Sequence, residues 1–486
     1  MTTSFELNGH LTTAVGLPFI ASLLVARVYK RGWVRWFSAL VTSVSLTLVA
    51  SVAWCLGLGS HDAGWAIDQT SRLPLPSSQA LLGLDVLGAQ IAVIVSLLVL
   101  GTIVGAPHRV MAGGNARRIL ALHGATIGLV CSRDLVLIGL FWGLGALLAV
   151  PREPHERGRA IGIFSLLSCI SLLLSFMLIG YLRTTSHLGP PSPFSTVLAG
   201  GTNDVVETIA FSLLLVAILI RQGVFPFHSW IPAVLERSSL GLGALLVNTH
   251  MGAYVFVRVG LPLFPEVARG AMPWVARLAL LTVLLGSLLA FGQTRLRRAI
   301  AFIMMSQSAL LMVGLNGLNH SSFTGGLTHW CASSLALTGL ALVCWSIESR
   351  VGDHDLRRFG GLSYRAPGLA AAFLFLGLSS VGLPGTLGFV SEDLLIHGIL
   401  AQSPRLGTLI VISTALNGFK ILSIFCHVFL GPFHGICRDA SLSTKEYGVL
   451  MVFASLLCLG GLRPSIVVGP ASLIARQHQL PAAGRH

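Results

Sequence analysis

Charged side chains are scarce in this sequence. Asp, Glu, Lys and Arg make up 10% of its 486 residues and apolar residues 54%, whereas a typical soluble domain is roughly a quarter charged. No polar stretch is long enough to fold as a separate soluble domain. The composition excludes an ordinary soluble protein and predicts an all-α polytopic membrane protein with short loops.

Several sequence features that would indicate other functions are also missing. The eight cysteines form no C-x-x-C pair and no iron–sulfur spacing, which predicts packed thiols instead of a metal or disulfide framework. No glycine-rich nucleotide loop follows a predicted strand. We therefore expect no redox cofactor and no metal in this chain. The first ten residues contain no Lys or Arg, which argues against a cleaved signal peptide.

Acidic residues are the scarcer of the two charge types, because 32 Lys and Arg stand against 18 Asp and Glu. The basic residues gather in alternate loops, at 27–35, 109–118, 152–159, 295–298 and 350–365. This pattern is typical of orientation signals and not of a nucleic-acid surface, so we expect no nucleic-acid partner. The clusters should face the cytoplasm of a bacterial inner membrane, with both termini outside. Some clusters have a possible second use as contacts for a peripheral partner or for anionic lipid.

Apolar runs of bilayer-spanning length predict about fourteen transmembrane helices. They lie near 12–28, 33–58, 82–105, 114–131, 134–150, 160–182, 205–235, 240–263, 274–292, 298–317, 324–348, 368–402, 407–430 and 446–463. The tail after Pro464 is too polar and too short to span.

Two of these spans contain helix-breaking residues. Pro226 and Pro232 interrupt 205–235, and Pro384 with its neighbouring glycines interrupts 368–402. Broken helices at corresponding places in two halves indicate an internally repeated transporter with sites in mid-membrane. We therefore divide the chain into N-terminal helices (1–113), a first repeat (114–264), a second repeat (265–432), and a last helix with a polar tail (433–486).

Five collinear motifs resemble one known family, the antiporter-like membrane subunits of respiratory complex I. Related subunits occur in membrane-bound hydrogenases and multisubunit sodium/proton antiporters. The motifs are Pro226-Phe-His-Ser-Trp-Ile-Pro232, Gln293-Thr-Arg-Leu-Arg-Arg-Ala-Ile-Ala-Phe302, the loop 356–367, Gly382-Leu-Pro-Gly-Thr-Leu-Gly-Phe-Val-Ser-Glu392, and Phe429-Leu-Gly-Pro432. The resemblance implies fourteen helices with an inverted five-helix repeat. It also implies proton translocation driven by redox chemistry in other subunits.

The residues of the family's proton route are only partly kept here. The helix-five glutamate falls on Gly143, in Phe-Trp-Gly-Leu, and the helix-seven lysine falls on Arg221. The helix-eight lysine falls on His250, and the helix-twelve carboxylate is kept as Glu392. On helix eleven the family's lysine falls on Ser333, whereas the histidine before it is kept as His329.

The chemistry of these side chains assigns their roles. Buried lysine can release its proton, whereas arginine stays charged, so Arg221 suits a fixed field or a gate. Imidazole exchanges protons near neutrality, so His250 suits a relay. A single histidine in an apolar run is more often a packed core residue, as we expect for His123 and His397. The full candidate set for proton relay or gating is Glu392, His250, Arg221, His228, His329, Lys420 and His427.

Four functions remain open from the sequence. The first is a proton-translocating membrane subunit of a complex I-like NADH-quinone oxidoreductase. The second is a secondary cation/proton antiporter subunit, and the third is a proton-conducting subunit of an inorganic-carbon uptake complex that pairs with a soluble zinc protein. The fourth is a scaffold that has lost conduction, which the changes at Gly143 and Arg221 suggest. In the first three readings the partners are other membrane subunits and the lipid bilayer.

Overall fold

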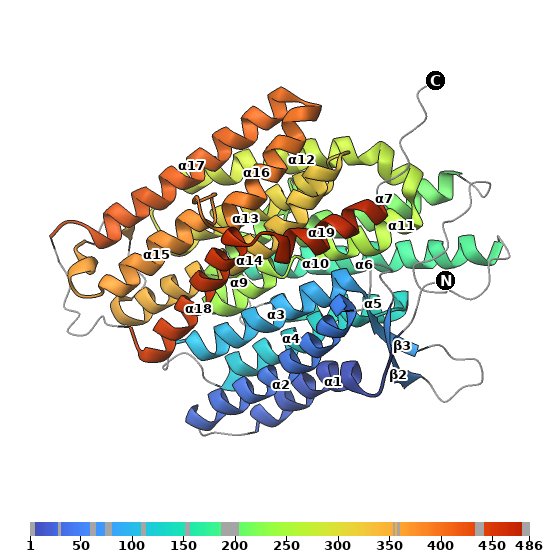
Figure 1. Cartoon of the computed structure of the whole chain (residues 1–486), viewed down its shortest axis with the longest axis horizontal. Helices are drawn as coiled ribbons and strands as arrows, with labels where there is room; N and C mark the ends of the chain where they lie inside the picture. Colours follow the sequence, from blue (N-terminus) through green and yellow to red (C-terminus); the bar gives the residue numbers. More distant parts are fainter. Residues whose placement is uncertain are drawn as a thin grey trace.

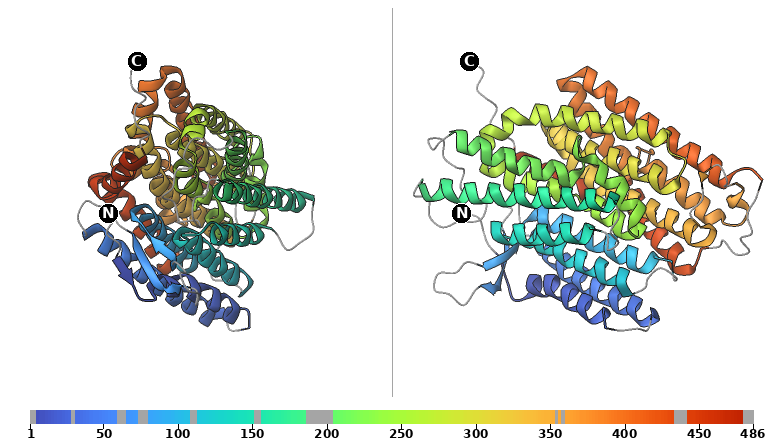
Figure 2. Two further views of the ribbon diagram at one scale, coloured as in Figure 1. Left: turned by 90° about the vertical axis from the view of Figure 1, so that its right-hand side faces the viewer. Right: turned by 180° about the vertical axis from the view of Figure 1, so that it is seen from behind.

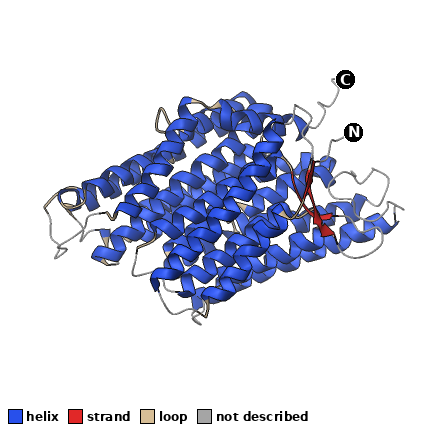
Figure 3. Ribbon diagram, turned by 60° about the horizontal axis from the view of Figure 1, so that its bottom comes forward, coloured by secondary structure: helices blue, strands red, loops and turns tan. Residues whose placement is uncertain are grey.

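Long helices lying side by side make up almost all of the structure (Figures 1 and 3). The computed structural model describes residues 5–27, 31–58, 65–72, 80–107, 113–150, 156–185, 204–352, 355–356, 360–432 and 442–478. Of the basic loop residues considered above, those outside these ranges are Lys30, Arg109, Arg152, Arg357 and Arg358.

The N-terminal half begins with two helices and a small sheet, followed by further helices. Its elements are β1 (Phe5–Leu7), α1 (His10–Val25), α2 (Arg31–Leu58), β2 (Ala66–Arg72), β3 (Ala80–Leu84), α3 (Val86–Gly105), α4 (Gly113–Cys131), α5 (Leu135–Ala149), α6 (Glu156–Thr185), α7 (Asp204–Gln222), α8 (Trp230–Arg237), α9 (Leu240–Asn248), α10 (Met251–Val255) and α11 (Leu261–Leu263).

The C-terminal half is helical throughout its described part. Its helices are α12 (Pro265–Phe291), α13 (Leu296–Leu315), α14 (His320–Val351), α15 (Pro367–Ser379), α16 (Leu387–Gln402), α17 (Pro404–Phe429), α18 (Thr444–Leu462) and α19 (Ser465–His478). The blue helices α1 and α2 and the orange helix α17 lie at opposite edges of the bundle (Figures 1 and 2). Helices α13 and α14 are almost entirely buried and form its centre.

Among the described residues, ten helical segments are long and apolar enough to cross a membrane. Shorter apolar helices lie at His10–Val25, Leu135–Ala149, Pro367–Ser379 and Ser465–Arg476. The predicted polytopic helical membrane fold is therefore confirmed, whereas the count of fourteen spans and the inverted repeat stay predictions.

The sheet is an element that the sequence analysis did not predict. The run 82–105 was expected to be one helix, but Ala80–Leu84 forms strand β3. β3 pairs antiparallel with β2, and β1 pairs with β2 in parallel. Helix α3 starts only at Val86, because the Asp85 carboxylate accepts a hydrogen bond from the Gly88 N–H (2.9 Å) and caps the helix.

Asp68 of β2 fastens helix α1 to the sheet. Its buried carboxylate accepts hydrogen bonds from the backbone N–H groups of Gly9, Leu11 and Thr12, each at 2.9 Å, and from the Thr70 hydroxyl at 2.8 Å. Burial alone would raise the pKa of Asp68, but the hydrogen bonds from Thr12, Thr70 and Gly9 outweigh it and hold that pKa below its usual value.

Both predicted helix breaks are confirmed, but Pro232, predicted to take part in the first, lies within helix α8. Helix α7 ends at Gln222, and the chain passes through Gly223, with φ +66°, and a 3-10 turn at Phe227–Ser229 before α8 begins. The Trp230 indole N–H donates to the Ile220 carbonyl (2.7 Å), which also accepts a hydrogen bond from the Gly223 N–H (3.1 Å) at the end of the helix. The second break separates α15 from α16, where Gly382 and Gly385 both have positive φ.

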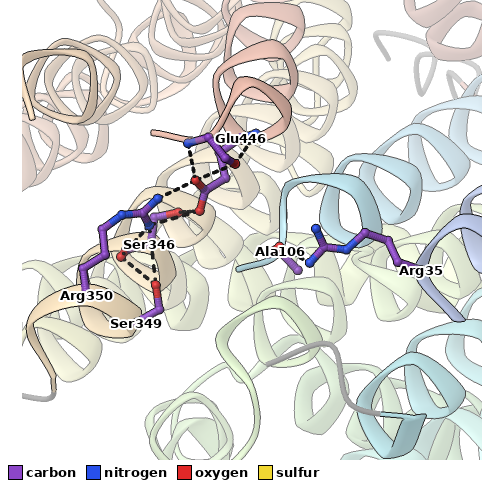
Figure 4. A network of polar contacts seen from close by, with 7 residues as sticks. Arg35, Ala106, Ser346, Ser349, Arg350 and Glu446 are labelled. Carbon is purple, nitrogen blue, oxygen red and sulfur yellow. Dashed lines mark hydrogen bonds and ion pairs between the residues drawn. The ribbon is translucent and has the colours of Figure 1, made fainter. Parts of the chain in front are cut away.

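Arginine side chains join the helices at one end of the bundle, which we call the basic end. Arg35 donates to the carbonyl of Ala106 just after α3 (2.6 Å), and Arg350 pairs with Glu446 at the start of α18 (2.6 Å) (Figure 4). At the same end Arg297 of α13 pairs with Glu348 of α14 at 2.5 Å. Several residues of the predicted basic clusters therefore hold helix ends together.

The segment after Pro464 departs from the expected polar tail. Residues Ser465–His478 form α19, which packs against α14 and α3. The His320 ring nitrogen lies 3.2 Å from the Ser472 carbonyl oxygen. At the junction of α18 and α19, Gly461 approaches the backbone of Gly385 closely, so a glycine is needed there to seat the last helix against the second break.

Candidate functional site

Polar side chains of α13 and α14 contact the two helix breaks described above and a third interruption at His250. The Ser308 hydroxyl of α13 donates to the Gln222 carbonyl at the end of α7 (3.2 Å) and lies 3.5 Å from Nδ1 of His250. His329 of α14 reaches α16, where its Nδ1 lies 3.4 Å from the Ser391 hydroxyl oxygen. Polar groups from both halves of the chain therefore meet inside the bundle.

His250 marks a third interruption, between α9 and α10, which the sequence analysis did not predict. Its backbone is left-handed (φ +48°, ψ +40°), and it is the one non-glycine residue with positive φ in the described chain. The imidazole is 1% exposed and lies edge-on to the Trp330 indole, with ring centroids 5.9 Å apart. Its Nε2 has no hydrogen-bond partner among the described residues.

Glu392 lies one residue after Ser391 on α16, beside the second break. Its side chain is buried, and its Oε1 has no hydrogen-bond partner among the described residues. A Cβ atom added at Gly382 would lie 2.8 Å from Oε2, so the carboxylate packs against a backbone that only glycine leaves open. The Ser391 hydroxyl donates to the Gly388 carbonyl (2.8 Å), which fixes it between His329 and the start of α16.

Arg221 occupies the last turn of α7, beside α5. Its guanidinium carbon lies 5.6 Å from the centre of the Trp142 indole. The indole N–H donates to the Ser168 hydroxyl (3.1 Å), which holds the ring in place. A Cβ atom at Gly145 would lie 2.7 Å from an Arg221 nitrogen. In the part of the chain that the structure describes, no Asp or Glu forms an ion pair with Arg221, so the indole face is its observed partner.

Three other candidates lie apart from this group. Lys420 is buried on α17, where its ammonium donates to the carbonyls of Phe291 (3.3 Å) and Gln293 (3.1 Å) at the end of α12. That geometry is typical of a helix C-cap. His427 is on the exposed face of α17, with Nδ1 2.7 Å from the Ser423 carbonyl oxygen.

The third, His228, is half-buried in the 3-10 turn of the first break. Its ring stacks on Phe225, with centroids 5.8 Å apart. Of the two histidines expected to be packed core residues, His123 is buried with Nε2 3.1 Å from the Ser96 hydroxyl. The expectation was wrong for His397, which is exposed beside Asp393.

Sequence reasoning missed the side chains that lie between the titratable ones. They are the hydroxyls of Ser308 and Ser391 and the indole of Trp330, with the contacts described above. The amide of buried Gln307 is also among them, and neither of its polar atoms has a partner in the described residues. A signal was present, because Ser306-Gln307-Ser308 places three polar residues together inside an apolar span.

Comparison with known proteins gives a family match and a fold match. Residues 132–417, more than half of the chain, match the family described as "NADH:quinone oxidoreductase/Mrp antiporter, TM". NADH-quinone oxidoreductase subunit M of Pseudomonas aeruginosa is 26% identical, over 96% of this chain and 97% of that protein.

Two solved structures share the fold. A chain of respiratory complex I from Thermus thermophilus with bound NADH matches with a TM-score of 0.84 and 25% identity, over 96% of this chain and 99% of that one. A chain of the Mrp complex from Dietzia sp. matches with a TM-score of 0.82 and 18% identity, over 97% of both, which is a likeness of fold alone. With the family matched over residues 132–417, this protein belongs to the NADH:quinone oxidoreductase/Mrp antiporter family of membrane proteins.

Proposed function

We propose that this chain is a proton-translocating membrane subunit of a complex I-like NADH-quinone oxidoreductase. One observation carries the proposal: buried proton-exchanging and hydroxyl groups from four helical segments meet across the helix breaks. The series consists of Ser308 beside His250 and of His329 beside Ser391, the residue before Glu392. The two pairs adjoin because His250 lies edge-on to Trp330, the residue after His329. Buried ionisable groups in a membrane protein are costly and are typical of ion pathways.

Each member of the series has the chemistry that a proton relay needs. Histidine and glutamate take up and release protons, and a serine hydroxyl can donate and accept a hydrogen bond at once. The buried Nε2 of His250 and Oε1 of Glu392 lack protein partners among the described residues. Because buried polar groups are almost always hydrogen-bonded to protein or to water, we propose that water completes the relay at these two atoms.

The remaining candidates receive different roles in this proposal. Arg221 supplies a fixed positive charge, because arginine holds its proton and the Trp142 face positions the guanidinium. His228 lies in the 3-10 turn of the first break, apart from the series, and we assign it a gating role at that break. Lys420 stabilises the end of α12, and His427 faces outward, so neither carries protons through the bundle.

The family assignment extends the proposal to the rest of the assembly. Redox chemistry belongs to other subunits, and this chain holds no redox cofactor of its own. Its partners are other membrane subunits and the lipid of a bacterial inner membrane. Both termini lie outside, and residues 114–264 and 265–432 form the two inverted repeats. The similarity to NADH-quinone oxidoreductase subunit M and to a complex I chain supports this reading over a free-standing antiporter.

Proton pumping by the complete assembly in liposomes tests the relay. We expect Glu392→Gln and His250→Ala to abolish or strongly reduce the protons moved per NADH oxidised. His427→Ala is the matched control, since it removes an exposed histidine from the same bundle, and it should pump normally. Unchanged pumping in both relay variants would leave the scaffold reading. Sodium-dependent proton movement without NADH would instead assign the antiporter function.

A further inference from the structure

An open groove of about 680 Å³ lies between α2, α3 and α18, away from the relay. Its walls are almost wholly apolar and include Leu40, Leu97, Leu100, Val104, Val449 and Val452. Leu40 and Val452 are 62% and 48% exposed. The groove therefore opens on the outer surface of the bundle.

The groove has a cationic mouth at the basic end. The Lys445 ammonium lies 4.4 Å from the centre of the Trp36 ring, and both residues line the groove. Figure 4 shows the neighbouring charges: Arg35 contacts Ala106, and Arg350 holds Glu446.

The one carboxylate described at this mouth already has hydrogen-bond donors from the protein on both of its oxygens. Both oxygens of Glu446 accept hydrogen bonds, from Ser346 at 2.9 Å, from Arg350 at 3.1 and 2.6 Å, and from Ser443 at 2.8 Å. Its negative charge is balanced by Arg350. Lys445 and Arg35 therefore leave a positive field where the groove opens at the basic end.

We propose that this groove binds an anionic phospholipid, with the phosphate at Lys445 and one acyl chain along the apolar walls. The wall on α18 runs from Lys445 to Phe453, which is about 12 Å at 1.5 Å per residue. A transmembrane partner helix, about 10–12 Å across, would need a contact along the whole span. A short apolar slot with a cation and an exposed indole at the membrane surface suits a lipid better. The proposal stands apart from the relay.

Quenching of Trp36 by lipids with brominated acyl chains tests the proposal in the full-length chain. The signal of this one indole is obtained by subtracting the Trp36→Phe variant. We expect brominated phosphatidylglycerol to quench it at about fivefold lower concentration than brominated phosphatidylcholine, because one cation near the surface contributes about 1 kcal/mol. Lys445→Gln should remove this preference.

A second variant tests the apolar part of the site. A Cβ atom added at Gly448, which lines the groove, meets no atom within 4 Å, so Gly448→Leu adds an apolar side chain to the slot from an open position. It should reduce the Trp36 quenching by both lipids. Gly180→Leu on α6, where an added Cβ atom also meets nothing within 4 Å, and Arg405→Gln at an exposed site are the matched controls.

One set of results supports the proposal, and four results would overturn it. Preserved quenching in the controls together with the two losses supports it. Equal quenching by the two lipids in the wild-type chain overturns it, as does a preference that survives Lys445→Gln or quenching that survives Gly448→Leu. If brominated lipid does not quench Trp36 in the complete membrane assembly, the proposal is also overturned, because a protein segment would then cover the groove.

Discussion

His250 allows the backbone and the side chain of one relay position to be tested separately. Its left-handed backbone (φ +48°) costs a residue with a Cβ atom about 1–2 kcal/mol. His250→Ala removes the imidazole and keeps this strain, whereas His250→Gly removes both. Glycine also lowers the stability by about 0.4–1 kcal/mol, because the unfolded chain is more flexible at a glycine. We therefore expect the glycine variant to be more stable than the alanine variant by about 0.5–1 kcal/mol.

The alanine variant should be less stable than the wild-type chain, since it keeps the strain and loses the edge contact with Trp330, worth about 0.5–1.5 kcal/mol. In the glycine variant the relief of strain offsets most of that loss. A third variant, His250→Asn, tolerates the left-handed backbone and keeps a polar group near Ser308, but it cannot exchange protons near neutrality.

Thermal unfolding in one detergent and proton pumping by the reconstituted assembly measure the two effects. We expect the stability order Gly above Ala, with pumping lost in all three variants. Alanine equal to or more stable than glycine would refute the argument about backbone strain. Normal pumping by the asparagine variant would refute proton transfer through this imidazole.

Two further predictions concern the ends of the helices. Asp68→Asn should lower the stability of the chain by about 2–3 kcal/mol, because several backbone N–H groups lose a charged acceptor. Since the pKa of Asp68 is lowered by folding, its stabilisation is complete above about pH 4 and is lost as the pH falls through that lowered pKa; thermal unfolding against pH should show the loss in the wild type and not in the variant. Arg350→Gln should destabilise the chain by about 3 kcal/mol, because it leaves the Glu446 carboxylate buried without its cation. The double variant with Glu446→Gln should recover part of that loss, and additive losses in thermal unfolding would contradict the pairing.

Local chemistry explains which parts of the fold could be predicted from the sequence. The two confirmed breaks contain Pro226 and Pro384, which lack the backbone N–H that a helix interior uses and so disfavour a continuous helix. The sheet depends on partners far apart in the chain, since β1 pairs with β2 about sixty residues later. The run 80–84 is apolar enough to join the helix that follows it, so only the pairing with β2 identifies it as a strand.

The break at His250 had no local signal. Its neighbours Asn248 and Thr249 can continue a helix, and neither proline nor glycine precedes it directly. Contacts with another helix hold the interruption: the Ser334 hydroxyl of α14 donates to the Asn248 carbonyl (2.6 Å), and the Asn248 amide donates to Thr338 (2.9 Å). Such tertiary contacts override local preference, and a single sequence does not reveal them.

The candidate site likewise contains residues that sequence motifs locate and residues whose role only tertiary contacts reveal. Resemblance to the family located Glu392 and His250, because the motifs around them are contiguous in sequence. It did not separate Lys420, whose ammonium caps α12, from the groups near α13 and α14. The role of a buried lysine depends on which carbonyls lie within reach, and those carbonyls belong to a helix more than a hundred residues away.

Arg221 is the clearest case in which structure changes an interpretation drawn from motifs. From the motifs alone, the loss of the helix-five carboxylate at Gly143 removes the expected partner of this cation. On α5, however, the guanidinium lies against Trp142 and Gly145. Position 143 is rotated about 130° around the helix from the midpoint of those two residues, at about 100° per residue.

Restoring the carboxylate should therefore fail to restore a pair. A Cβ atom added at Gly143 meets no atom within 4 Å, so the first atom of the side chain in Gly143→Glu is accommodated. Its charge would point away from Arg221 and lie half-buried at membrane depth, where a charge without a partner costs about 2–3 kcal/mol. We expect Gly143→Glu to unfold at a lower temperature than the uncharged control Gly143→Gln, with pumping no better than wild type. A higher unfolding temperature for the glutamate variant would show that Arg221 leaves the indole for a carboxylate, and the Trp142 face would then be only a substitute partner.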